Sequence, residues 1–199
     1  MSDSPMLGLR LPTDPRWVRL ASTNLHALLS DHAWCEQKAA LHALSTITRF
    51  PHLTELVAEL TRIAAEELEH FGLVQQRLTE RGWELLPEEK DDYVGDLARF
   101  IRRGGNLNQQ LVDRLLFAAM IEARSCERFR MLSETIDDAE LRTFYRDLMI
   151  SEAHHYTTFL GFARRYAGPN EDVEVRWQAF LDHEAELMQV YGKRETMHG

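Results

Sequence analysis

Two stretches of this chain carry charged side chains inside what would otherwise be continuous apolar helical stripes. Residues 56–78 place apolar side chains at helical spacing, and Glu67 and His70 interrupt that face. A later stretch, rich in phenylalanine, has Glu152 and His155 in the same position of its stripe. Burying a lone carboxylate costs much free energy, so each of these side chains needs a buried partner. The pattern therefore predicts a polar site inside a bundle of helices.

Helical patterns run through almost the whole sequence, and glycine and proline fall where helices should break. No alternating apolar pattern persists long enough to predict a strand. We therefore expect an all-α protein that forms one domain over residues 1–199 and is built on a four-helix bundle. The four long helices are expected at about 23–49, 53–81, 107–134 and 139–166.

Shorter helices are expected around this bundle. Pro15 suits the first turn of an N-terminal helix, since proline has no N–H to leave unsatisfied. Residues 83–107 read as an insert, with a short helix at about 91–103. An accessory C-terminal helix is expected at about 173–191.

Composition and charge narrow the class of protein. The chain has a formal net charge of −9 and only two cysteines, Cys35 and Cys126, which are too few for a disulfide framework. We find neither an apolar run of the roughly 20 residues that a membrane-spanning helix needs nor a signal-peptide pattern. We therefore expect a cytoplasmic protein with reduced cysteines and no membrane partner.

The spacing of the glutamates is more discriminating than the Glu-x-x-His motifs themselves. Glu36 lies 15 residues before Pro51 and Glu67 lies 16 residues after it, so an antiparallel hairpin would bring them to one height. Glu122 and Glu152 are equally far from Asp137, in a second turn-like segment. Each half thus offers one glutamate and then a Glu-x-x-His motif.

Two such hairpins packed face to face would gather four carboxylates and two imidazoles. This is the ligand set of di-iron and di-manganese carboxylate bundles, and hard oxygen ligands with one imidazole per metal suit iron or manganese. Glu67 and Glu152 are expected to bridge the metals, and Glu36 and Glu122 to bind one each. His32, one turn before Glu36, could lie behind the ligands, but a packed or exposed histidine is the favoured interpretation. The predicted metal ligands are Glu36, Glu67, His70, Glu122, Glu152 and His155.

The chain contains four distinctive segments, DHAWCEQKAA (31–40), EELEHF (66–71), IEARSCERF (121–129) and SEAHHY (151–156). They resemble a known family, the bacterial tRNA hydroxylases that act on 2-methylthio-isopentenyladenosine. The metal motifs are shared with all ferritin-like di-iron proteins, and the flanking Trp34-Cys35 and Arg124-Ser125-Cys126 narrow the match. The resemblance covers most of the chain.

The resemblance implies a ferritin-like fold and an O₂-dependent di-iron monooxygenase. Such an enzyme would hydroxylate the isopentenyl group of the modified adenosine in tRNA, with no catalytic residue beyond the metal ligands. It would use two iron ions, with O₂ as co-substrate. It would also need an electron-donor protein of the ferredoxin or flavoprotein reductase type.

Binding to tRNA needs positive charge, which this acidic chain offers only locally. The candidates for phosphate contacts are Arg99, Arg102, Arg103, Arg164 and Arg165. A solvated face of mixed charge is an equally good interpretation of any one of these arginines.

Three other functions remain open on the residues alone. An iron-storage or iron-oxidation protein of the ferritin type would share all six ligands. A peroxide-reducing di-iron protein would share them too, although such proteins commonly add a four-cysteine iron site that this chain cannot form. A helical interaction module without enzymatic activity would need none of the ligands.

Overall fold

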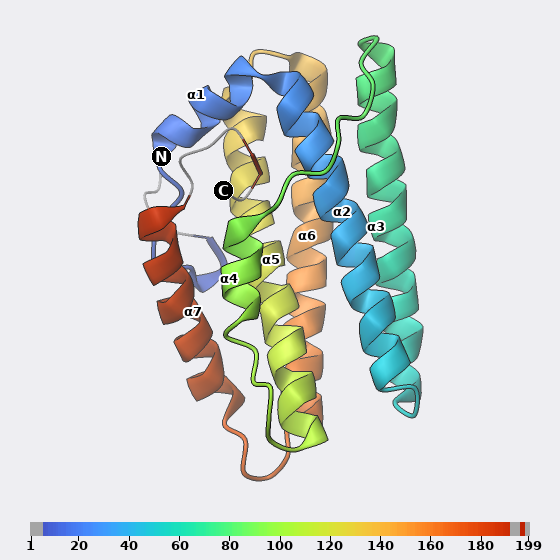
Figure 1. Ribbon diagram of the computed structural model, residues 1–199, viewed down its shortest axis with the longest axis vertical. Coiled ribbons are helices and arrows are strands. Elements are labelled where there is room, and N and C mark those ends of the chain that lie inside the picture. Colours follow the sequence, from blue (N-terminus) through green and yellow to red (C-terminus); the bar gives the residue numbers. More distant parts are fainter. Residues whose placement is uncertain (1–5, 192–195, 198–199) are drawn as a thin grey trace. The chain divides into compact units, whose positions relative to one another are not determined.

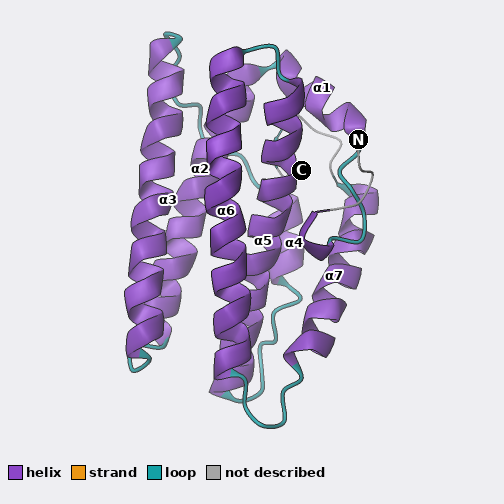
Figure 2. Ribbon diagram, turned by 180° about the vertical axis from the view of Figure 1, so that it is seen from behind, coloured by secondary structure: helices purple, strands orange, loops and turns teal. Residues whose placement is uncertain are grey.

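The computed structural model describes residues 6–191, 196 and 197, and all regular structure among them is helical (Figure 2). Within these residues, no helix combines the length and the apolar character that crossing a membrane requires. The helices are η1 (Met6–Gly8), α1 (Pro15–Thr23), α2 (Leu25–Arg49), α3 (Thr54–Glu80), α4 (Asp92–Ala98), α5 (Leu107–Thr135), α6 (Ala139–Tyr166) and α7 (Val173–Val190). The four long helices predicted from the sequence are thus confirmed within about two residues at each end.

The chain divides into two compact units, which we call the α2–α3 unit and the α5–α6 unit. Among the described residues, the first consists mainly of 21–90, and the second mainly of 6–20 and 91–191. Each unit is built on one antiparallel pair of long helices that lie side by side (Figure 1). The single domain over residues 1–199 that the sequence predicts stays a prediction.

Local signals explain where the α2–α3 hairpin begins and turns. The side chain of Asn24 accepts a hydrogen bond from the backbone N–H of Ala27 (3.2 Å) and so caps the first turn of α2. α2 ends at Arg49, before Pro51, which cannot continue a helix. α3 ends before Gly82, whose positive φ of 71° suits glycine and little else.

The α5–α6 hairpin is fixed by two stronger caps. Asn106 and Gln109 form a reciprocal capping box at the start of α5. The Asp138 carboxylate accepts hydrogen bonds from the backbone N–H groups of Glu140 and Leu141, both 3.0 Å long, and so starts α6. α5 ends at Thr135 and the Asp138 cap starts α6, which leaves a short turn at residues 136–138, around the Asp137 from which Glu122 and Glu152 are equally far.

The shorter helices of the α5–α6 unit are held by a buried cluster of charged side chains. Arg124 of α5 donates to Glu184 of α7 (2.6 Å and 2.9 Å) and also pairs with Glu127. The hydroxyl of Tyr93 in α4 donates to the same Glu184 carboxylate (3.1 Å). Because these side chains are almost fully buried, their mutual hydrogen bonds offset the cost of removing charge from water.

Arg128 lies beside this cluster and is held differently. Its guanidinium is fully buried and lies 4.8 Å from the centre of the Trp17 ring, a cation–π contact with α1. Burial lowers the pKa of Arg128 to about 10, and the nearby positive charge of Arg124 adds to the effect. The two arginines thus attach α1, α4 and α7 to α5.

The variant Glu184→Ala tests this attachment. It leaves the buried guanidinium of Arg124 without its main partner, so we expect the free energy of unfolding to fall by about 3–5 kcal/mol. Denaturant unfolding followed by circular dichroism measures the loss. The control is Glu186→Ala on the same helix, because that side chain is 78% exposed. An equal effect of both changes would contradict a structural role for the cluster.

Candidate metal centre

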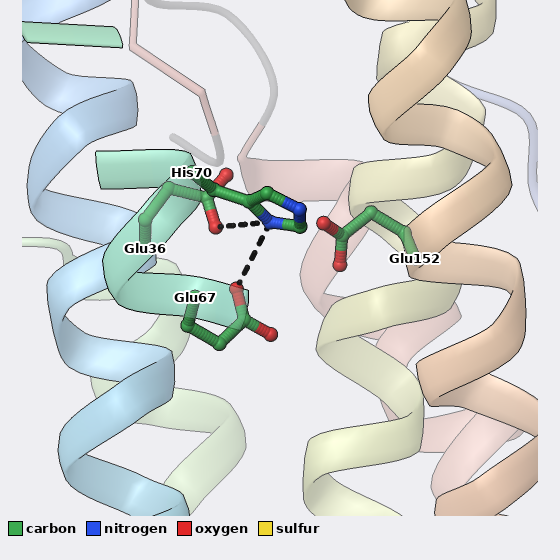
Figure 3. A group of neighbouring side chains, drawn as sticks. All are labelled: Glu36, Glu67, His70 and Glu152. Carbon is green, nitrogen blue, oxygen red and sulfur yellow. Dashed lines mark ion pairs between the residues drawn. The ribbon is translucent and has the colours of Figure 1, made fainter. Parts of the chain in front are cut away.

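The α2–α3 unit brings three of the predicted ligands together. Glu36 comes from α2, and Glu67 and His70 come from one face of α3, three residues apart. His70 Nδ1 lies 3.5 Å from Glu67 Oε2 and 3.7 Å from Glu36 Oε2 (Figure 3). One ligand atom from each residue lies within 4.8 Å of those of the other two. All three side chains are buried.

Behind this first triad lies His32, one helical turn before Glu36. Its imidazole is fully buried, and its Nε2 atom lies 2.6 Å from Glu36 Oε1. The sequence left open whether His32 packs or supports the ligands, and the structure shows the contact with Glu36. The signal in the sequence was the spacing of four residues, which places two side chains on one helical face.

The α5–α6 unit holds a matching second triad. Glu122 comes from α5, and Glu152 and His155 come from α6. Their ligand atoms also lie within 4.8 Å of one another, and His155 Nδ1 is 3.7 Å from Glu152 Oε2. All three are buried, whereas the neighbouring His154 is exposed. Each hairpin therefore repeats the same set of one lone glutamate and one Glu-x-x-His pair.

Cys126 lies near the second triad as a neutral thiol. Burial raises its pKa to about 12, and the charge of the Glu152 carboxylate adds to the effect. The thiol donates a hydrogen bond to the carbonyl of Met149 (3.4 Å). Cys126 is thus protonated at neutral pH and fills space as a small apolar side chain.

The chemistry of the donor set fits iron. In each triad two carboxylates and one imidazole crowd together away from water, and two negative charges so placed repel each other unless a cation lies between them. Carboxylate oxygens with one imidazole nitrogen suit iron or manganese. The two triads are thus buried carboxylate–imidazole clusters compatible with iron binding.

Most of the arginines predicted to touch RNA already pair with carboxylates. Arg102 donates to Asp113 (2.7 Å) and to Glu171 (2.7 Å) in a half-buried network. Arg99 pairs with Asp96, and Arg164 pairs with Glu174. A phosphate at these three guanidinium groups would compete with the carboxylate. Arg103 and Arg165 are exposed.

The network around Asp113 makes stability depend on pH. Burial would raise the pKa of Asp113, but hydrogen bonds from Arg176 and Arg102 outweigh it and lower the pKa below the ordinary 3.8. The ionised carboxylate stabilises the fold at neutral pH. Because the pKa of Asp113 is lower in the folded state, its contribution to stability is complete above the ordinary pKa of an aspartate. That contribution is lost as the pH falls through the lowered pKa.

We therefore expect Asp113→Asn to destabilise the protein at pH 7 and to reduce the loss of stability between about pH 5 and pH 2. Denaturant unfolding at a series of pH values measures both effects. Asp147→Asn, an exposed aspartate on α6, is the control and should leave the pH dependence unchanged. If both variants show the same curve as the unmodified protein, Asp113 carries no such linkage.

Comparisons with known proteins find the same family over almost the whole chain. A family model described as tRNA-(MS[2]IO[6]A)-hydroxylase (MiaE) matches residues 5–199. Two relatives are both named tRNA 2-(methylsulfanyl)-N(6)-isopentenyladenosine(37) hydroxylase. The protein from Pseudomonas putida is 38% identical over 181 residues, which cover 91% of this chain and 86% of the relative. The protein from Salmonella typhimurium is 28% identical over 235 residues, which cover 93% of this chain and 85% of the relative.

A solved structure extends the likeness to three dimensions. It is described as protein 43 with aldehyde deformylating oxygenase activity from Synechococcus. It matches with a TM-score of 0.88 at 35% identity and covers 96% of this chain and 95% of its own. The predicted fold class, all-α and ferritin-like with a four-helix bundle and accessory helices, is confirmed.

Proposed function

The chain belongs to the MiaE family of tRNA-(MS[2]IO[6]A)-hydroxylases. We therefore propose that it hydroxylates the isopentenyl group of 2-methylthio-N6-isopentenyladenosine in tRNA. The observation that carries the di-iron chemistry of this proposal is the pair of matched, buried triads, one in each helix hairpin. The ligand pattern alone left iron storage and peroxide reduction open, and family membership favours the hydroxylase over both.

We propose that the two triads act together on two iron ions. The support is their identical composition, their burial and the equal spacing of the glutamates along the two hairpins. When bound, the iron pair would activate O₂, so that one oxygen atom enters an allylic C–H bond and the other leaves as water. This reaction consumes two external electrons and two protons. An electron-donor protein of the ferredoxin or flavoprotein reductase type would supply the electrons.

The protein's own residues would hold this centre and keep it dry. Glu36, Glu67, His70, Glu122, Glu152 and His155 would bind the irons. Buried apolar side chains flank the ligands along their helices: Leu148 lies one turn before Glu152, and Phe159 one turn after His155. Excluding water in this way strengthens electrostatic contacts and prevents side reactions of the activated oxygen.

For the tRNA backbone the proposed contacts are the five arginines predicted from the sequence, of which Arg103 and Arg165 are exposed. Arg99, Arg102 and Arg164 also pair with carboxylates, so a phosphate would compete with these partners. A local basic surface attracts phosphate even when the net charge of the chain is negative, because screening limits the reach of distant acidic groups to about 8–10 Å.

A second candidate is the activity of the Synechococcus neighbour, aldehyde deformylation. The shared fold and 35% identity over nearly the whole chain favour it as an alternative use of the same centre. The substrate of this second candidate function would be an aldehyde and not a tRNA. Incubation with an aldehyde and a reducing system, with detection of the deformylated product, separates the two functions.

The ligand set is tested by Glu152→Ala. Loss of one buried carboxylate should abolish the binding of two irons per chain and hydroxylation together. Iron content after anaerobic loading with Fe²⁺ measures the first, and nucleoside analysis of treated tRNA measures the second. Glu140→Ala, an exposed glutamate on the same helix, should retain two irons. Two irons retained in Glu152→Ala would show that the ligand set is wrong.

The substrate is tested in cells by deleting the gene for this protein. The hydroxylated isopentenyl nucleoside should disappear from total tRNA, and its unhydroxylated precursor should accumulate. Mass spectrometry of digested tRNA measures both nucleosides. The unmodified protein should restore the product on complementation, and Glu152→Ala should not. Unchanged tRNA in the deletion strain would discard the proposed substrate.

A further inference from the structure

The contact between His32 and Glu36 gives the two carboxylate oxygens of Glu36, a proposed metal ligand, different neighbours. An ionised carboxylate has no proton to give, so the Nε2–H of His32 is the donor and Glu36 Oε1 the acceptor, at 2.6 Å. The other oxygen, Oε2, lies 3.7 Å from His70 Nδ1 and so faces the ligand group. One oxygen is therefore held by the protein while the other remains for a metal.

In the second triad the corresponding helix position holds a different residue. Four residues before Glu122, at the position that corresponds to His32, the chain has Ala118. The methyl group of Ala118 cannot donate a hydrogen bond to a carboxylate. The two hairpins repeat the ligands but not the imidazole behind the lone glutamate.

We propose that His32 is a positioning residue that makes Glu36 bind its metal through Oε2 alone. This rests on the proposed di-iron function. The hydrogen bond is between two buried groups on one helix, so the orientation of the carboxylate is set before a metal arrives. Partners of this kind, which orient a ligand from behind, typically contribute 10–100-fold to metal affinity.

The experiment compares two amides at position 32 of the full chain. In His32→Gln the amide N–H reaches about as far as Nε2, whereas the shorter side chain of His32→Asn stops short of Glu36. Anaerobic titration of the metal-free protein with Fe²⁺, followed by calorimetry, measures the affinity of each site. Mössbauer spectra of the loaded proteins report the environment of each iron separately.

We expect His32→Asn to weaken one of the two Fe²⁺ sites about 10–100-fold and to leave the other unchanged. Its Mössbauer spectrum should change for one iron only. His32→Gln should regain most of the lost affinity, which a purely structural role would not predict. The control His52→Asn changes an exposed histidine in the α2–α3 turn and should match the unmodified protein.

Two results would overturn the proposal: unchanged Fe²⁺ binding in His32→Asn, or equal losses in both amide variants. Failure of the unmodified protein to bind two Fe²⁺ ions would instead discard the di-iron function itself. If circular dichroism shows that His32→Asn does not fold, His32→Leu replaces it in the same comparison. Leucine has a similar volume and no donor.

Discussion

The burial of four glutamates on the long helices is the constraint on which the rest of this structure depends. A carboxylate in a low-dielectric interior is stable only beside a group that offsets its charge. In each hairpin the glutamates meet a histidine from the same triad, because a lone glutamate and a Glu-x-x-His motif lie at equal distances from the turn. The lengths of the helices and the positions of the turns thus determine where the ligands lie.

Much of this could be predicted from the sequence because the signals are local. The long helices follow from apolar spacing of three to four residues, and their ends follow from Asn24, Pro51, Asn106 and Asp138. The grouping of each triad follows from the same local rules, since counting residues on either side of one turn fixes which side chains share a height. The joining of both triads into a single six-ligand centre stays a prediction.

Contacts between residues far apart in the sequence could not be predicted in this way. Arg102 looked like a free cation for RNA, but Glu171, 69 residues later, and Asp113 hold its guanidinium. Arg124 and Glu184 are 60 residues apart, and nothing in their local patterns predicts their ion pair. A single sequence shows which residues could share a helix face, but not which distant helix covers that face.

Buried carboxylates in this protein have two kinds of partner. The partner differs between the carboxylates that stabilise the fold and those proposed to bind metal. Glu184, Glu127 and Asp113 pair with arginines, whose permanent charge and several donors fix the helices in place. The glutamates of the triads lie instead beside histidines, which can be neutral and can therefore share a metal with the carboxylates. An arginine at either position would neutralise the carboxylate permanently and compete with the metal. Arg124 and Arg128 of α5 lie in the cluster that fixes α1, α4 and α7, and so the same helix can carry a rigid ion pair and a metal ligand without one blocking the other.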